Sequence, residues 1–425
     1  LEMGPPIFQI KEHVVESQHI REYPRATAQS QEDILHLAVK QYVPLDNPNP
    51  QEGDITIIGA HANGFPKELY EALWEDIHAR SKKAGFRIRG IWIADVVQQG
   101  ASGVLNEGLL GNDPGWMDHP RDLLHMINHF RKEMPQPLVG IGHSMGGNHL
   151  VNLALIHPRL ISTLILMDPV IQFHASQPPS PETGPGPAYA STFRRDLWPS
   201  RAAAEEAFRK QKFYQSWDPR VFDCWLKFGI RETPTQLYPN EKGAVTLTTT
   251  KHQECFTFLR PSWEGMNEDK ETIRDLSLIP DMRPDSLVKF PFYRPEPPNT
   301  MLRLGELRPS VLYIFGGTSP MSSPPERKRK MDMTGVGTGG SGGAKAGRVS
   351  EVTLEGIGHL VAMEASEQCA DAIVHWVGPE VSRFREERKK YTEWTKKTIK
   401  EKTTLSEEWQ KRMGGPPVRR AKSKI

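Results

Sequence analysis

The residues best suited to chemistry lie in the stretch Gly142-His143-Ser144-Met145-Gly146-Gly147. A short apolar, β-prone segment precedes it, and residues 148–157 have the apolar spacing of a helix. A serine at the apex of a sharp strand-to-helix turn forms a nucleophile elbow. Gly142 and Gly146 flank the serine where a side chain would crowd the turn, so glycine fits both positions. An ordinary glycine-rich turn is the alternative, but this order of strand and helix favours Ser144 as a nucleophile.

A serine hydroxyl becomes nucleophilic when a histidine takes its proton, and a carboxylate must orient that histidine. His359 follows an apolar segment at residues 349–354, in a Gly-x-Gly-His-Leu setting, and is the only one of the 15 histidines so placed. We therefore expect His359 to be the base. His143, beside the serine, is expected to point away from the nucleophile and, with Phe65, to contact the substrate.

The acid is expected at the end of the strand that follows the elbow helix. Most proteins with the chain order serine, acid, histidine carry the acid after a later strand, here residues 311–315. The residues that follow, 316–320, contain no carboxylate. Asp168 instead ends the strand after the elbow helix, from which it can reach His359. The alternatives are that Asp168 only caps a turn before a proline, or that Glu364 supplies the carboxylate.

Two backbone amides must face the oxyanion that develops when the serine attacks a carbonyl group. Met145, directly after the nucleophile, is expected to provide one amide. The loop at residues 61–64 is expected to provide the other, and we favour Asn63 over Ala62. This chemistry requires no metal and no organic cofactor.

The surrounding sequence alternates between apolar strands and amphipathic helices. We expect strands at residues 34–43 (an edge strand), 55–59, 86–97, 138–141, 160–167, 311–315 and 349–354, and helices at 66–77, 120–130, 148–157, 201–213 and 366–377. This alternation is typical of a mostly parallel sheet covered by helices on both faces, with the active site at the carboxyl ends of the strands. Together with the elbow it predicts an α/β-hydrolase fold.

The chain is expected to divide into five parts. These are an irregular lead-in at 1–30, in which Leu1 and Glu2 look like a cloning remnant, the first part of the core at 31–169, a lid insertion at 170–300, the second part of the core at 301–378, and a charged helix and tail at 379–425. A glycine-rich tract at 334–347 lacks the Lys-Ser/Thr of a phosphate-binding loop and is expected to be a mobile loop.

Composition excludes several classes of protein. The 425 residues are 37% hydrophobic and 25% charged, and the net charge of +2 gives no case for a nucleic-acid partner. The three cysteines are far apart and form no Cys-x-x-Cys pair, which argues against a disulfide framework or a zinc site and suits a reducing compartment. No apolar run reaches membrane-spanning length.

The end of the sequence carries two further signals. Ser423-Lys424-Ile425 is similar to Ser-Lys-Leu, a peroxisomal address read by an import receptor, although a frayed basic tail is the alternative. Residues 380–412 are almost wholly charged, with aromatic residues spaced along them. They fit either a solvated helix or an arm that docks on a second subunit in a homodimer.

The chain resembles the fungal peroxisomal α/β-hydrolases of secondary metabolism, in particular their acyl-coenzyme A hydrolases. The similar stretches are Pro66–Glu71, Trp116–His119, Pro137–Gly147, Tyr293–Pro297 and Gly356–Leu360. The resemblance implies a thioesterase whose triad falls on Ser144, Asp168 and His359, a peroxisomal location and a dimer.

We therefore expect a serine hydrolase that cleaves acyl-coenzyme A thioesters. Basic groups near the lid would favour coenzyme A, and the candidates are Arg194, Arg195, Lys210 and Lys212. A carboxylester or lipid hydrolase could use the same triad, and a scaffold that only binds a ligand remains a third reading. An epoxide hydrolase or a dehalogenase is disfavoured because its elbow nucleophile would be an aspartate.

Overall fold

The computed structural model describes residues 6–175, 186–270, 272–282 and 291–415. The chain divides into two compact units, Leu1–Glu380 and Val381–Ile425. All the predicted site residues lie in the first unit. Within the described residues no helix is long and apolar enough to span a membrane.

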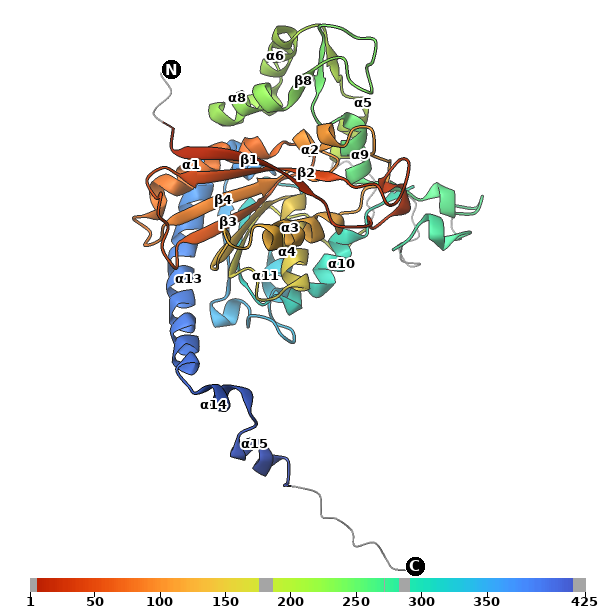
Figure 1. The fold of residues 1–425 in the computed structure, drawn as a ribbon. Coiled ribbons are helices and arrows are strands. Elements are labelled where there is room, and N and C mark those ends of the chain that lie inside the picture. The colour runs from red at the N-terminus through yellow and green to blue at the C-terminus, as the bar shows by residue number, and fades with distance from the viewer. Residues whose placement is uncertain (1–5, 176–185, 271, 283–290, 416–425) are drawn as a thin grey trace, which may run out of the picture. The chain divides into compact units, whose positions relative to one another are not determined.

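An eight-stranded sheet forms the core of the first unit (Figure 1). Its strands, in spatial order, are β1 (Phe8–Glu16), β2 (His36–Pro44), β4 (Ile88–Ala94), β3 (Ile55–Ala60), β5 (Leu138–His143), β6 (Thr163–Met167), β12 (Ser310–Gly316) and β13 (Val349–Leu354). The pairings β1–β2 and β2–β4 are antiparallel and the others are parallel. The predicted α/β-hydrolase sheet is confirmed.

Helices cover the sheet. They are α1 (Glu71–Ser81), α2 (Gly100–Leu105), α3 (Asp118–His129), α4 (Met145–Ile156), α10 (Glu296–Arg303), α11 (Pro324–Met333), α12 (Val361–Glu364) and the part of α13 (Ser366–Thr395) that belongs to the first unit. Short 3₁₀ turns lie at Lys67–Tyr70 and Leu304–Glu306, among others. Figure 1 shows α3, α4 and α10 together on one side of the sheet. Every residue of β3, β5 and β12 is buried, which explains why these segments are almost continuously apolar.

The segment expected to be a lid lies between β6 and β12 and belongs to the same compact unit as the sheet. It contains α5 (Gly186–Phe193), α6 (Arg201–Arg209), α7 (Lys212–Gln215), α8 (Pro219–Phe228) and α9 (Lys251–Phe258), with strands β7 (Leu197–Trp198), β8 (Ile230–Glu232), β9 (Val245–Leu247), β10 (Arg260–Pro261) and β11 (Phe292–Tyr293). The expected lid boundary at 300 falls inside α10, a helix that packs on α4. That helix is therefore part of the core.

Two predictions about the amino-terminal residues were wrong. The expected irregular lead-in contains β1, which pairs with β2 along nine residues from Phe8–Pro44 to Glu16–His36. β2 is consequently the second strand of the sheet and not its edge. Several side chains of β1 are exposed, so the strand lacks the apolar character that predicts a buried one.

Two predictions about later segments were also wrong. The glycine tract is not an open mobile loop, because its backbone bonds to the turn before β12: Gly337 N donates to Gly305 O at 2.8 Å. A Cβ on Gly340 would lie 2.4 Å from Gly305 O, so this close approach requires glycine. The expected break between a closing helix and a charged helix is absent, since α13 continues through Pro379. Beyond α13, the second unit contains α14 (Ile399–Thr403) and α15 (Glu407–Arg412).

Candidate active site

Ser144 lies at the turn between β5 and α4, with φ 56° and ψ −117°. A non-glycine residue with positive φ is strained, as expected of a nucleophile elbow. A Cβ on Gly142 would lie 2.5 Å from Gly146 O, and a Cβ on Gly146 would lie 2.1 Å from Ala60 O. The predicted crowding of the turn is therefore confirmed for Gly142, whereas Gly146 is required by the close approach of the end of β3.

His359 lies between β13 and α12 and bridges the serine and an aspartate. Its Nε2 is 2.8 Å from Ser144 Oγ, and its Nδ1 is 2.5 Å from Asp168 Oδ2. The carboxylate accepts from Nδ1–H, so Nε2 is left to accept the serine proton. The structure brings together the three residues expected to form the triad.

Asp168 follows β6, is fully buried and has φ 41°. Besides His359, it accepts hydrogen bonds from Ser319 Oγ at 2.5 Å, Ser322 Oγ at 2.5 Å and the Gly316 amide at 3.2 Å. Burial raises the pKa of Asp168, but the hydrogen bonds from His359 and the two serines outweigh burial and hold that pKa below its ordinary value. The side chain is therefore a carboxylate throughout the neutral range.

The loop after β12 thus supplies hydroxyl donors at the place where many relatives of the fold carry the acid. The sequence shows the missing carboxylate there, but nothing in it indicates that Ser319 and Ser322 donate to the acid. The alternative acid, Glu364, instead accepts from the Gly358 amide at 3.3 Å, and His359 bonds to Asp168. The geometry favours Asp168 as the acid partner.

The amides expected to form the oxyanion hole are open to an acceptor. Among the described residues, no hydrogen bond is recorded from the backbone N–H of Met145 or of Asn63. Met145 begins α4, where the first backbone N–H groups have no partner within the helix. The Ala62 amide donates to Tyr70 Oη at 2.9 Å, which leaves Asn63 as the better donor from this loop.

Gln99, for which the sequence carries no signal, holds this loop. Its Oε1 accepts from the Gly64 amide at 2.7 Å, and its Nε2 donates to Asn63 Oδ1 at 2.5 Å. The side-chain amide of Asn63 in turn donates to Glu254 O of lid helix α9 at 3.1 Å. The loop at residues 61–64 is consequently fixed from both the core and the inserted segment.

We expected His143 to contact the substrate. Its side chain is instead fully buried and is not accessible to a ligand. Its Nδ1 is 2.9 Å from Tyr70 Oη, and its Nε2 is 2.9 Å from His359 O. Since Tyr70 accepts from the Ala62 amide, it donates to Nδ1, and His143 then donates from Nε2 to the His359 carbonyl. This series of hydrogen bonds links the oxyanion loop to the backbone of the base.

Phe65 is half-buried beneath the lid. Its ring packs edge-on against Trp217 at 5.6 Å and Trp225 at 6.2 Å between centroids. The Asp218 amide at the start of α8 donates to Met363 O at 2.8 Å, in the helix that follows His359. The lid thus contacts both loops of the candidate site.

The basic residues expected near the lid are mostly engaged. Arg194 pairs with Glu254 at 2.5 Å and Lys210 pairs with Glu206 at 2.6 Å. Arg195 donates to Leu197 O at 2.7 Å. The Arg194–Glu254 ion pair is more buried than the Lys210–Glu206 pair, so Arg194 holds the end of α5 against α9.

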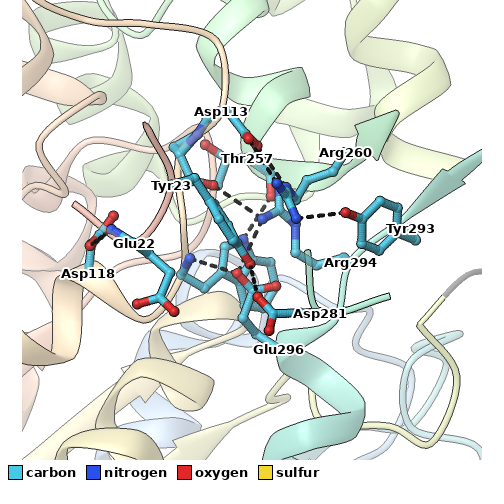
Figure 2. Close-up of polar contacts among 12 residues, drawn as sticks. Glu22, Tyr23, Asp113, Asp118, Thr257, Arg260, Asp281, Tyr293, Arg294 and Glu296 are labelled. Carbon is cyan, nitrogen blue, oxygen red and sulfur yellow. Dashed lines mark hydrogen bonds and ion pairs between the residues drawn. The ribbon is translucent and has the colours of Figure 1, made fainter. Parts of the chain in front are cut away.

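The second half of the lid is fastened by a buried polar network, shown in Figure 2. Arg260 forms two hydrogen bonds to Asp113, at 2.7 and 2.8 Å, and its guanidinium lies 3.6 Å from the centroid of the Tyr23 ring. Glu296 accepts from the Trp116 amide at 2.9 Å and pairs with Arg294 at 3.3 Å. These contacts join the residues before α3 to β10, β11 and α10.

A cavity of about 450 Å³ opens between the α2 region and the lid. Its lining includes Gln98, Leu110, Leu237, His252, Gln253 and Phe256. Gln98 and Gln99 both donate to Thr257 Oγ1, at 3.0 and 3.2 Å. Because Gln98 lines the cavity and Gln99 also bonds to Asn63, these hydrogen bonds connect the cavity wall to the loop that contains Asn63.

Several known proteins are similar to this chain. The type I acyl-CoA thioesterase mpaH of Penicillium roqueforti is 42% identical over 439 residues, covering 99% of this chain and 98% of that protein. The thioesterase mpaH' of Penicillium brevicompactum is 41% identical, with coverage of 99% and 98%. The profile of the Hydrolase_4 family, described as serine aminopeptidase, S33, matches residues 83–217.

Solved structures show the same fold. The peroxisomal α/β-hydrolase Lpx1 of Saccharomyces cerevisiae has a TM-score of 0.67 at 17% identity and covers 96% of each chain. The thioesterase domain from the curacin biosynthetic pathway has a TM-score of 0.50 at 14% identity, covering 86% of this chain and 99% of that domain.

Proposed function

Because this chain belongs to the family of the fungal type I acyl-CoA thioesterases, we propose that it hydrolyses an acyl-coenzyme A thioester to a free acid and coenzyme A. We further propose that Ser144, His359 and Asp168 form the catalytic triad. The observation that carries this proposal is the position of His359 within hydrogen-bond reach of both partners, at 2.8 and 2.5 Å.

In the first half of the reaction, Ser144 Oγ attacks the thioester carbonyl carbon while its proton passes to His359 Nε2. The carbonyl oxygen becomes an oxyanion, which accepts hydrogen bonds from the Met145 and Asn63 amides. The carbon–sulfur bond then breaks, and His359 returns the proton to the leaving sulfur. The products are an acyl ester on Ser144 and free coenzyme A.

In the second half, a water molecule attacks the acyl ester and gives its proton to His359. The same two amides stabilise the second oxyanion. The bond from the acyl carbon to Ser144 Oγ breaks as the serine recovers its proton, and the free acid leaves. Asp168 stabilises the imidazolium in both halves, since the lowered pKa of Asp168 keeps it ionised.

The cavity of about 450 Å³ is the candidate site for the part of the substrate beyond the thioester. The volume of this cavity lies within the range of known ligand pockets. Part of its wall is apolar and is formed by Leu110, Leu237 and Phe256. The hydrogen bonds that connect Gln98 in the cavity wall, through Thr257 and Gln99, to Asn63 of the proposed oxyanion loop favour this cavity as the substrate site.

A panel of acyl-coenzyme A thioesters and matched oxygen esters tests the function. Release of coenzyme A from the thioesters is measured with a thiol reagent, and release of free acid from the oxygen esters is measured by pH titration. The native chain is compared with Ser144→Ala and with the control Ser162→Ala, whose serine immediately precedes β6 at the opposite end of the strands. Thioester turnover lost only in Ser144→Ala supports the proposal. Turnover of the oxygen esters alone would establish the carboxylester reading, and a lack of turnover on both sets would leave the binding-scaffold reading.

We also propose a peroxisomal location and a homodimer. The Ser423-Lys424-Ile425 signal lies outside the described residues and would act where these residues end the natural chain. Fluorescent fusions with and without these three residues test import. Exposed Tyr391 and Trp394 in the second unit favour an interface there, and light scattering of the native chain and Trp394→Ala tests the homodimer.

A further inference from the structure

Two histidines that the proposed reaction does not use are buried side by side near the nucleophile elbow. His119 in α3 is 2% exposed and His149 in α4 is 1% exposed, and their ring centroids are 5.0 Å apart. Within the described part of the chain, none of their four ring nitrogens has a hydrogen-bond partner. Buried polar groups in folded proteins are almost always paired, so these ring nitrogens are expected to bind a small polar partner.

A small cavity lies at these rings. Its volume is about 10 Å³, and its lining includes Arg21, Trp116, Asp118, His119, Met145 and His149. One water molecule requires roughly 10 to 15 Å³ on this measure. The cavity therefore admits a single water molecule and nothing larger.

The chemistry of the lining selects the occupant. Burial lowers the pKa of both histidines, that of His149 to about 3, so both rings are neutral at ordinary pH. A neutral imidazole has one donor and one acceptor nitrogen, so the occupant must be able both to donate and to accept. The terminal nitrogens of the nearby Arg21 are paired with Asp122 through bonds of 2.9 and 2.8 Å. Its Nε lies 3.5 Å from Asp118 Oδ2 and has no hydrogen-bond partner among the described residues, so it is a further donor in this lining.

We propose that this cavity binds one structural water molecule, which bridges a ring nitrogen of His119 and a ring nitrogen of His149. The water joins α3 to the elbow helix α4. His149 stands one turn after Met145, which lines the same cavity, so the water supports the helix that presents the proposed oxyanion amide. It also gives a role to the Trp116–His119 stretch, which the reaction does not otherwise use.

A crystal structure of the native chain at about 1.8 Å resolution or better tests the site. We expect one density peak within hydrogen-bond distance, about 2.7 to 3.2 Å, of both rings. An empty cavity, or rings rotated onto protein acceptors, would overturn the proposal. A peak at about 2.0 to 2.1 Å from the nitrogens with an anomalous zinc signal would also overturn it, because a metal would then be the occupant.

Thermal unfolding gives a second test that does not depend on crystals. Either His119→Leu or His149→Leu removes one end of the bridge and should lower the melting temperature by a few degrees. In the double variant both rings are gone, so we expect a loss smaller than the sum of the single losses. The exposed His125 on the same helix provides the control, His125→Leu. Losses that simply add would contradict a shared water.

Discussion

The ring of His143 and the backbone of His359 are joined by a hydrogen bond of 2.9 Å between Nε2 and the carbonyl oxygen. His143 is adjacent to the nucleophile in sequence, while His359 is the candidate base, so the bond fixes the loop of the base relative to the elbow. Tyr70 continues the connection to Ala62 through two bonds of 2.9 Å. Burial, together with the neighbouring His359, lowers the pKa of His143 to about 3, so this ring stays neutral and the connection persists across the working range of pH.

Tyr70→Phe should slow turnover without changing substrate affinity greatly. The variant removes the acceptor of the Ala62 amide and the donor to His143, so the oxyanion loop loses a constraint beside Asn63. We expect kcat to fall by about tenfold, which corresponds to about 1.4 kcal/mol in the activation free energy. Tyr42→Phe is the matched control, since this buried hydroxyl bonds to Glu71 instead. Equal kcat values for the two variants would show that Tyr70 has only a structural role.

The double variant Ser319→Ala and Ser322→Ala should weaken the acid of the triad. Both hydroxyls donate to Asp168 and help to hold its pKa low, so their removal raises that pKa and leaves the carboxylate free to move out of the position that orients His359. We expect a lower kcat and an acid limb of the pH–rate profile displaced to higher pH. Ser310→Ala, at the other end of β12, should leave the profile in place. An unchanged profile in the double variant would contradict the role of these serines.

Leu237→Trp should separate short substrates from long ones. Leu237 lines the cavity of about 450 Å³ and is 41% exposed, so a larger side chain can fill space there without disturbing the core. We expect KM to rise for acyl-coenzyme A substrates with large acyl groups and to stay constant for acetyl-coenzyme A. A matched loss on every substrate would argue against the cavity as the place of the acyl chain.

Stability should fall as the pH is lowered from about 6.5 towards 3. His143 and His149 have a folded-state pKa of about 3, whereas the unfolded chain protonates near 6.5. Between these values the unfolded state binds more protons, so the stability present above pH 6.5 is lost progressively. Each histidine contributes up to about 1.4 kcal/mol per pH unit in this window. Denaturant unfolding at pH 7 and pH 5 should therefore show a smaller pH effect in His149→Gln than in the native chain, and an equal effect would contradict burial of a neutral ring.

The elbow could be predicted from the sequence because its constraints are local. Gly142, Ser144 and Gly146 lie within five residues of one another, and the steric need for glycine at position 142 follows from the turn alone. Asp168 could be predicted because parallel strands end at one edge of the sheet and the later strand offered no carboxylate. The closing strand likewise placed His359 at the same edge.

The supporting residues could not be predicted because their partners are distant in sequence. Tyr70 bonds to His143 across 73 positions, and Ser319 bonds to Asp168 across 151. Nothing in the residues around Tyr70 or Gln99 indicates that they hold an oxyanion loop. The expectation that His143 would contact the substrate was wrong for the same reason, since only the folded chain reveals the carbonyl that its ring binds.

Acylation of Ser144 tests the central claim most directly. The native chain is mixed with an acyl-coenzyme A substrate, quenched with acid during turnover and digested, and the peptide that contains Ser144 is examined by mass spectrometry. The account predicts a mass increase equal to the acyl group on Ser144 and no adduct or turnover in Ser144→Ala. Thioester hydrolysis that continues in Ser144→Ala, with Ser144 unmodified in the native chain, would contradict it.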